Sequence, residues 1–215
     1  MLFYEKELDL YQKILQCKKF ESWVDITNSS LSMCKKKGLF LEFGVFQGNT
    51  ATHIINYLLR NKISDILYGF DSFEGLPEDW VTRNNKVIKK GHFKTDVPKL
   101  CDNIKIIPGL FEDTLPNFVK ENFHFVSFMH IDCDLYSSTK TIFSNFANLI
   151  DDGTIILFDE IIGYEYFRNH EYKAFVEFLR DTGRQALPIG YCGIKASFKI
   201  INLASKYSTP VRLSS

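Results

Sequence analysis

Short apolar runs alternate with segments of helical spacing along most of this chain, and that alternation limits the fold more than any other feature. Runs of strand length lie at 39–43, 65–70, 103–107, 124–131 and 154–158. Helical spacing occurs between them at about 49–60 and again at about 137–149. Because parallel strands need crossover connections, which are usually helices, this order predicts a mostly parallel sheet covered by helices on both faces. The expected fold class is a doubly wound, Rossmann-like α/β fold.

The two ends of the chain depart from this alternation. Residues 2–36 have helical spacing with charged faces, which predicts an N-terminal helical cap over 1–37. Near the other end, 185–192 and 196–203 resemble strands and are separated by a short gap that contains glycine. Two strands so close in sequence predict an antiparallel hairpin at one edge of the sheet.

The length and charge of the chain indicate how many domains it has and what kind of molecule it binds. A chain of 215 residues with 45% hydrophobic content fits one domain over 1–215, with its α/β core at 38–215. The 26 basic residues balance 26 acidic ones, so nothing predicts binding to nucleic acid or to an anionic membrane. We expect a small-molecule substrate, a cytoplasmic location and, as an open possibility, a homo-oligomer.

A glycine-containing turn follows the first predicted strand. Gly44 and Gly48 stand in a G-x-x-x-G spacing just before a predicted helix, where free backbone N–H groups can hold a polar ligand. The spacing is not the G-x-G-x-x-G of dinucleotide sites, and an ordinary tight connection is the alternative. Asp71 ends the second strand, where a carboxylate can accept hydrogen bonds from both hydroxyls of a ribose or can cap the next element. A glycine turn after the first strand, followed by an acid at the end of the second, favours a nucleoside-containing ligand.

The third predicted strand places an aromatic side chain and an acid at the same edge. Phe111 and Glu112 follow Pro108 and Gly109, and they are predicted to meet the face and the edge of an adenine. The alternatives are core packing for the aromatic ring and an acid at a helix N-terminus for the carboxylate.

Four carboxylates follow the fourth and fifth predicted strands. Asp132 and Asp134 end one strand, and Asp159 and Glu160 end the next. Their mutual repulsion predicts a divalent cation, and oxygen donors favour magnesium over zinc, with calcium or manganese as alternatives. Helix capping is the competing explanation for the two aspartates of the D-x-D segment. His130, inside the preceding apolar strand, is interpreted as a hydrogen-bonded core residue.

Five segments in order resemble one known family. LEFGVFQGNT, FDSFEGLP, PGLFEDTLP, HIDCDLYSST and DGTIILFDE match the pattern of the macrocin O-methyltransferase family and, more distantly, that of the metal-dependent catechol-type methyltransferases. The resemblance covers about 38–180 and implies a class I methyltransferase that uses S-adenosylmethionine and Mg²⁺. Relatives often carry Asp or Asn where this chain has Glu160.

The resemblance also implies roles for individual residues. The glycine turn would hold the methionine part of the cofactor, Asp71 its ribose, and Asp134 would be the general base. Metal ligands would be Asp132, Asp159 and Glu160. The full set of predicted cofactor-binding residues is Glu42, Gly44, Phe46, Gly48, Thr50, Asp71, Ser72, Phe111, Glu112 and Asp132.

These residues predict methylation of a hydroxyl on a small polar molecule. The metal would orient two oxygens of the acceptor, so a vicinal diol such as a sugar fits best. A metal-dependent glycosyltransferase is one alternative, because D-x-D segments also bind sugar-nucleotide diphosphates. A catalytically silent nucleotide-binding partner protein is the other.

Overall fold

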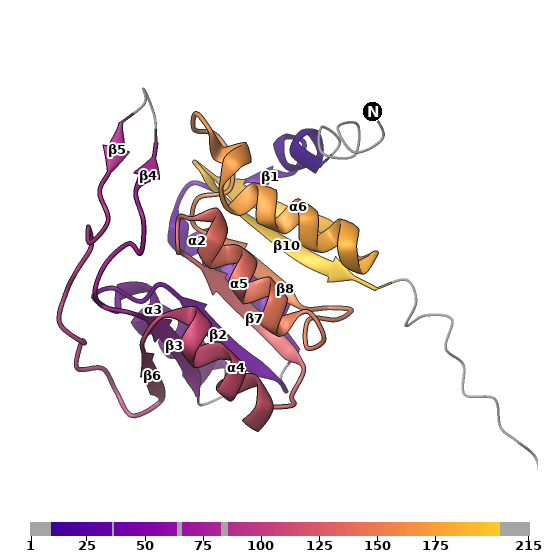
Figure 1. The fold of residues 1–215 in the computed structure, drawn as a ribbon. Helices are drawn as coiled ribbons and strands as arrows, with labels where there is room; N and C mark the ends of the chain where they lie inside the picture. The colour runs from indigo at the N-terminus through magenta and orange to yellow at the C-terminus, as the bar shows by residue number, and fades with distance from the viewer. Residues whose placement is uncertain (1–9, 36, 64–65, 83–85, 203–215) are drawn as a thin grey trace, which may run out of the picture.

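The computed structural model describes residues 10–35, 37–63, 66–82 and 86–202 and shows an α/β sandwich (Figure 1). Its main sheet has the order β1-β9-β10-β8-β7-β2-β3-β6, and a separate pair is formed by β4 and β5. The strands of the main sheet are β1 (Lys18–Lys19), β2 (Leu39–Phe43), β3 (Leu67–Asp71), β6 (Ile104–Pro108), β7 (Val126–Ile131), β8 (Ile155–Phe158), β9 (Gln185–Cys192) and β10 (Lys195–Ile201). Strands β6, β3, β2, β7 and β8 are mutually parallel, as predicted.

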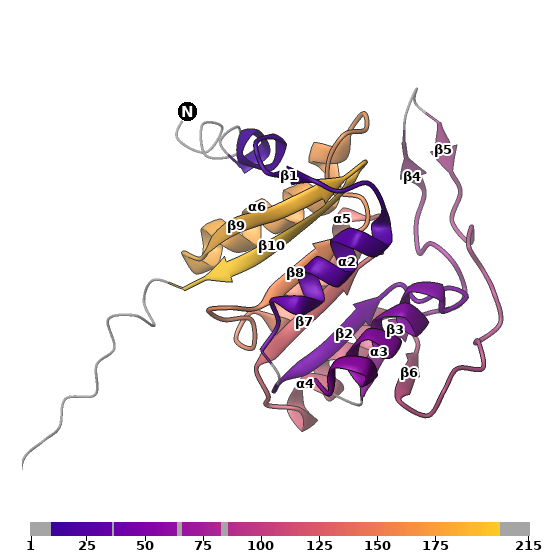
Figure 2. The same ribbon diagram turned by 180° about the vertical axis from the view of Figure 1, so that it is seen from behind.

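Helices cover both faces of this sheet (Figures 1 and 2). On one face lie α4 (Phe111–Glu121), α5 (Tyr136–Phe146) and α6 (Glu171–Thr182), with α5 in contact with both neighbours. The opposite face carries α2 (Trp23–Ser32) and α3 (Asn49–Asn61). The doubly wound, Rossmann-like arrangement predicted from the alternation is therefore confirmed.

Strand β2 shows why the sheet must be covered on both sides. All five of its residues are buried, and they alternate between two hydrophobic clusters. Leu41 and Phe43 join the cluster beneath α4, α5 and α6, whereas Phe40 joins the cluster beneath α2 and α3. A strand buried on both faces has a continuous apolar sequence, and this is the pattern that predicted a strand at 39–43.

The predicted C-terminal hairpin is present, whereas the N-terminal segment differs from a simple helical cap. Strands β9 and β10 pair antiparallel, and β10 joins β8 in the same sense. Residues 10–15 are helical, but Lys18–Lys19 then pair parallel with β9 through backbone bonds, which two lysines do not signal in a hydropathy pattern. Helix α2 then packs on a sheet face, where Ser30 Oγ donates to Ser197 Oγ at 2.7 Å. Residues 1–9 of the predicted cap lie outside the described residues.

A long segment between β3 and β6 forms one wall above the sheet. It contains β4 (Trp80–Val81) and β5 (Val87–Ile88), which pair antiparallel and project beyond the carboxyl ends of the parallel strands (Figure 1). Trp80 is buried, and its ring meets those of Tyr164 and His170 edge-on. His170 Nε2 also lies 3.0 Å from the carbonyl oxygen of Val81, so the N-terminus of α6 holds this wall in place.

Candidate functional site

The site lies where the strand order reverses. From β2 the chain proceeds outward to β3 and β6, and it then returns to the other side of β2 to form β7 and β8. In open α/β sheets, ligands bind at such a point, beyond the carboxyl ends of the strands. A cavity of about 430 Å³ opens there, lined by residues that follow each of the five parallel strands and by the first turns of α5.

Gly44 allows the ends of β2 and β7 to approach closely. Asp132 N donates to Phe43 O at 2.8 Å, and a Cβ atom on Gly44 would lie only 1.8 Å from Asp132 O. Gly44 also has a φ of +89°, which residues with side chains rarely adopt. Its place in the sequence motif is therefore explained by backbone geometry.

Replacing Gly44 with alanine is expected to destabilise the folded protein and to distort the turn that precedes Asp132. The added methyl group would overlap a backbone carbonyl that belongs to the sheet edge, so the two strand ends must separate. Thermal unfolding should show a lower midpoint than in the parent. Gly183→Ala provides a matched control, because that glycine also has positive φ but no atom within 4 Å of its Cβ position. Equal midpoints for the two variants would contradict the steric explanation.

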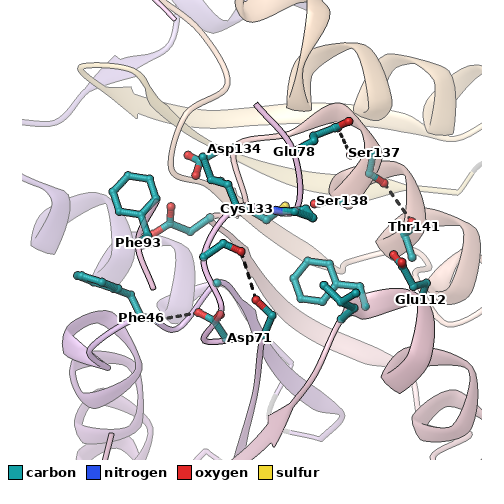
Figure 3. A pocket seen from close by; sticks show the side chains of 18 of the residues that line it. Phe46, Asp71, Glu78, Phe93, Glu112, Cys133, Asp134, Ser137, Ser138 and Thr141 are labelled. Carbon is teal, nitrogen blue, oxygen red and sulfur yellow. Dashed lines mark hydrogen bonds between the residues drawn. The ribbon is translucent and has the colours of Figure 1, made fainter. Parts of the chain in front are cut away.

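Asp71 braces the glycine turn. Its Oδ2 accepts hydrogen bonds from the backbone N–H groups of Val45 and Phe46, both at 2.8 Å, and the second of these is drawn in Figure 3. Its Oδ1 accepts one from Phe73 N at 2.8 Å. The side chain lines the cavity, and each carboxylate oxygen can accept more than one bond. Asp71 therefore shapes the turn and still presents acceptor capacity to a ligand.

The predicted cofactor residues divide into two groups. Those that line the cavity are Gly44, Phe46, Asp71, Ser72, Phe111, Glu112 and Asp132. Glu42, Gly48 and Thr50 are not among its lining residues. Glu42 is instead buried in β2, where its Oε1 lies 3.0 Å from His130 Nδ1, and the Gly48 backbone faces the Leu100 side chain. For these three residues, direct contact with a cofactor stays a prediction.

The four predicted acids meet on one wall of the same cavity. Asp132 and Asp134 reach it from the end of β7, and Asp159 and Glu160 reach it from the end of β8. Because β7 and β8 are parallel neighbours, Ile131 faces Phe158 in register, and the acids that follow these two residues are adjacent. The sequence prediction that they form one cluster agrees with the structure.

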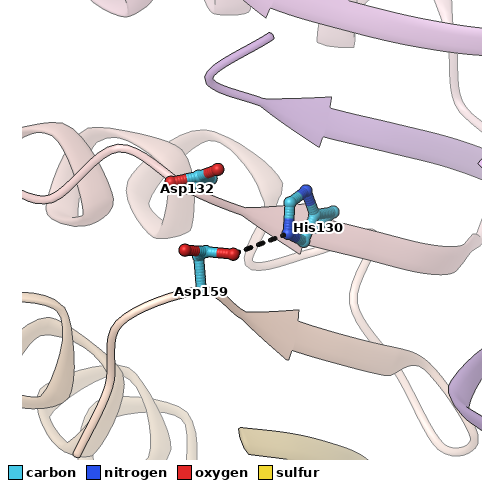
Figure 4. Close-up of side chains that lie close together, drawn as sticks. All are labelled: His130, Asp132 and Asp159. Atoms are coloured by element: carbon cyan, nitrogen blue, oxygen red, sulfur yellow. Dashed lines mark ion pairs between the residues drawn. The ribbon is translucent and has the colours of Figure 1, made fainter. Parts of the chain in front are cut away.

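Two cationic side chains that the sequence did not associate with the site accompany these acids. Lys195, at the start of β10, forms an ion pair with Asp159 Oδ1, and His130 Nε2 lies 3.9 Å from the same oxygen (Figure 4). His130 is buried and bonded to Glu42, as its interpretation as a core residue implied. The repulsion among the acids is therefore balanced partly by the chain itself, which weakens repulsion as an argument for a metal.

The pKa values follow from this mixture of burial and charge. Burial and the nearby Asp159 charge raise the pKa of Asp132 to about 8. Burial acts to lower the pKa of His130, but Asp159 and Glu42 outweigh it and raise that pKa to about 10. Burial likewise acts to raise the pKa of Asp159, but His130 and Lys195 lower it to about 2. At neutral pH the arrangement therefore favours a charged Asp159 between two cations and a protonated Asp132.

The D-x-D segment is a tight turn and not an extended strand. Asp134 has a φ of +65°, and Leu135 N donates to Cys133 O at 2.6 Å, which closes a three-residue turn around Asp134. An extended backbone would point Asp132 and Asp134 in opposite directions. The turn brings both side chains to the cavity, so separate roles for the two acids cannot be argued from alternation. A non-glycine residue in this conformation carries strain of about 1–3 kcal/mol, which surrounding contacts must offset.

One such contact comes from α6. Glu171 Oε1 accepts hydrogen bonds from Cys133 N and from Asp134 N, both at 3.2 Å. Glu171 is completely buried, and burial together with the Asp134 and Asp132 charges raises its pKa well above the ordinary value. Its second oxygen, Oε2, has no hydrogen-bond partner among the described residues. Burial and the same neighbouring acids also raise the pKa of Asp134.

Several cavity residues were not predicted. Glu78 and Phe93 come from the wall segment between β3 and β6, and Ser137 donates to Glu78 Oε1 at 2.5 Å, linking that wall to α5 (Figure 3). The two acids of the LPEDW stretch, Glu78 and Asp79, were the available signal. Lys195 and Glu171 have no local signal, because only the packing of β10 and α6 brings them to the acids.

The fold and the cavity define a class of protein: a doubly wound α/β protein with a ligand site at the strand-order reversal, lined by a glycine turn on one side and by carboxylates on the other. A family model described as a methyltransferase domain matches residues 41–161. The chain belongs to this methyltransferase family.

Solved structures support the same fold. The O-methyltransferase NovP superposes with a TM-score of 0.63 at 17% identity, over 82% of this chain and 78% of that one. The calicheamicin methyltransferase CalS11 gives 0.58 at 19% identity, over 82% and 76%. An apo structure of CalS11, described as a TDP-rhamnose 3'-O-methyltransferase, gives 0.57 at 17%, over 82% and 77%. At these identities the likeness concerns the fold. A search of curated proteins finds no match.

Proposed function

We propose that this protein transfers a methyl group from S-adenosylmethionine to a hydroxyl group of a small polar molecule that carries neighbouring hydroxyls, such as a sugar. The observation that carries the proposal is the division of one cavity into a braced glycine turn on one side and a wall of carboxylates on the other. Membership of the methyltransferase family favours methyl transfer over glycosyl transfer, the other reaction that a D-x-D segment suggested.

The glycine turn and Asp71 form the cofactor half of the proposed site. In this half, Asp71 receives the ribose hydroxyls, and the turn after β2 receives the amino-acid part. Phe111 packs edge-on against Phe43 and lines the cavity beside Glu112, which gives the adenine an aromatic surface and an acceptor. The methyl group would then point toward the carboxylate wall.

The carboxylate wall has the donor atoms that a magnesium ion requires. Asp132, Asp159 and Glu160 all line the cavity. The group whose ligand atoms lie within 4.8 Å of one another is His130, Asp132 and Asp159, so Glu160 is included for its place on the cavity wall. Oxygen donors suit Mg²⁺, although Lys195 engages one oxygen of Asp159. We assign Asp132, Asp159 and Glu160 as the residues that hold the metal. When bound, it supplies a positive charge that lowers the pKa of an acceptor hydroxyl.

Asp134 acts as the general base in this proposal. Its raised pKa, caused first by burial and then by Asp132, makes it a better proton acceptor than an exposed aspartate. The sulfonium donor is already reactive, so the chain must align the acceptor oxygen behind the methyl group and remove its proton. The turn around Asp134 directs its carboxylate into the cavity for that purpose.

The size and charge of the site restrict the acceptor. A cavity of about 430 Å³ that also holds a cofactor leaves room for a small molecule. Its acidic wall and the balanced charge of the chain give no attraction for a polyanion such as RNA. Among the described residues, no helix is both long and apolar enough to cross a membrane.

S-adenosylhomocysteine is expected to bind the parent protein and raise its melting temperature, because a ligand that binds only the folded state stabilises it. Asp71→Ala should weaken that binding by about 10- to 100-fold, since hydrogen bonds to a charged group contribute about 1.5–3 kcal/mol. Calorimetry measures both affinities. Asp102→Ala is the matched control, because that exposed aspartate is not among the cavity-lining residues. Binding of a nucleotide sugar in place of S-adenosylhomocysteine would refute the proposal, and an unchanged affinity in Asp71→Ala would remove the ribose assignment.

A further inference from the structure

We propose that Glu171 is the positioning residue of the D-x-D turn, holding Asp134 in the conformation that directs its carboxylate toward the acceptor. This inference rests on the proposed function, because it concerns the orientation of the proposed base. Glu171 is not a cavity-lining residue, so it acts through the backbone of the turn and does not touch the acceptor.

The contacts of Glu171 are directed at the turn itself. A single oxygen, Oε1, accepts from two consecutive backbone N–H groups, those of Cys133 and Asp134, at 3.2 Å each. The Cys133 thiol lies 3.7 Å from the same oxygen. Two consecutive N–H groups that point to one acceptor require a non-extended backbone at Cys133, the residue between them. Asp134, with its φ of +65°, continues the same turn directly after the second anchored N–H group. The carboxylate therefore selects this turn over an extended backbone.

The placement of Glu171 makes the contact rigid. It is the first residue of α6 and is fully buried among side chains of the main core, where Tyr172 and Phe175 of the same helix are also fully buried. A carboxylate in such surroundings is costly unless it accepts hydrogen bonds, and the two turn N–H groups supply them. The neighbouring His170 holds the backbone of Val81, so adjacent residues of α6 secure two walls of one cavity.

A test compares Glu171→Gln, which keeps an accepting oxygen, with Glu171→Leu, which keeps similar bulk and removes it. Amide hydrogen exchange followed by NMR reports on Cys133 and Asp134 without any acceptor. We expect exchange at these two amides to quicken by about 10-fold or more in Glu171→Leu and to remain near the parent rate in Glu171→Gln. Glu177→Leu is the matched control, because Glu177 lies on the same helix and bonds to Tyr136 and Lys140 instead.

Turnover gives the second readout. In Glu171→Leu we expect kcat to fall by about 100-fold with little change in S-adenosylhomocysteine affinity, since a small displacement of a reacting group has that effect. Glu171→Gln should recover most of the rate. Unchanged amide exchange in Glu171→Leu, or quickened exchange with parental kcat, would overturn the positioning role. A parent that binds no S-adenosylhomocysteine would overturn the proposed function instead, and the exchange experiment would still decide the contact.

Discussion

Replacing Asp134 with asparagine is expected to slow methyl transfer by about 10²- to 10⁴-fold, the usual cost of losing a general base. Asparagine keeps the size of the side chain and one accepting oxygen, but it cannot take the acceptor proton. S-adenosylhomocysteine affinity and Mg²⁺ affinity should stay near the parent values, because neither role is assigned to Asp134. Steady-state turnover with an acceptor found by screening sugars and other small diols measures the effect.

The control for this substitution is Asp113→Asn, in the first turn of α4, because Asp113 is not among the cavity-lining residues. It should retain parental turnover. Two other outcomes for Asp134→Asn have a clear structural interpretation. Both aspartates of the turn line the cavity, so a loss of Mg²⁺ affinity in Asp134→Asn would identify Asp134 as a metal ligand. Near-parental turnover would remove it from the reaction.

Removing divalent metal is expected to reduce methyl transfer to background, and added Mg²⁺ should restore it. The reason is the set of oxygen donors that Asp132, Asp159 and Glu160 bring to one cavity wall. Activity measured after exhaustive treatment with a chelator, and again after titration with Mg²⁺, checks this expectation. S-adenosylhomocysteine binding should persist throughout and shows that the protein remains folded.

Full activity after chelation would show that the acids do not act as metal ligands. His130 and Lys195 would then be the cations that balance them, since both lie beside Asp159. In that case Lys195→Met should lower activity sharply, because it would remove a charge that no metal replaces. A metal-dependent enzyme should tolerate the same substitution better, because the metal supplies positive charge to Asp159.

The positions of the acids were predictable, whereas their partners were not. Asp71, Asp132 and Asp159 each end or follow an apolar run, and parallel strands deliver their carboxyl ends to one edge of a sheet. Lys195 reaches Asp159 only because Ala196 pairs with Phe158 across an antiparallel ladder. That register depends on the whole sheet and cannot be predicted from the residues around Lys195.

Two local features of the structure were also not clearly predicted from the sequence. Helix α4 appeared in the sequence only as an alternative setting for Glu112, because Pro116 interrupts its helical pattern, although Leu115 and Phe118 are buried against the core. The positive φ of Asp134 was not predicted, because no glycine marks a turn in the D-x-D segment. Such a conformation depends on a distant acceptor, and Glu171 lies 37 positions further along the chain.

The reversal of strand order at β2 and β7 has a consequence for how this protein can change. Most residues assigned to S-adenosylmethionine precede position 113, and the acids assigned to the base and the metal follow position 131. Cofactor binding and the reaction are therefore assigned to separate stretches of the sequence. The segment around Glu78 and Phe93 also lines the cavity, and it contacts the rest of the chain through Ser137, His170 and the ring of Phe46. We expect exchange of that segment to change which acceptor the cavity takes while the proposed base stays in place. Directed variation for new acceptors should therefore begin at 76–93.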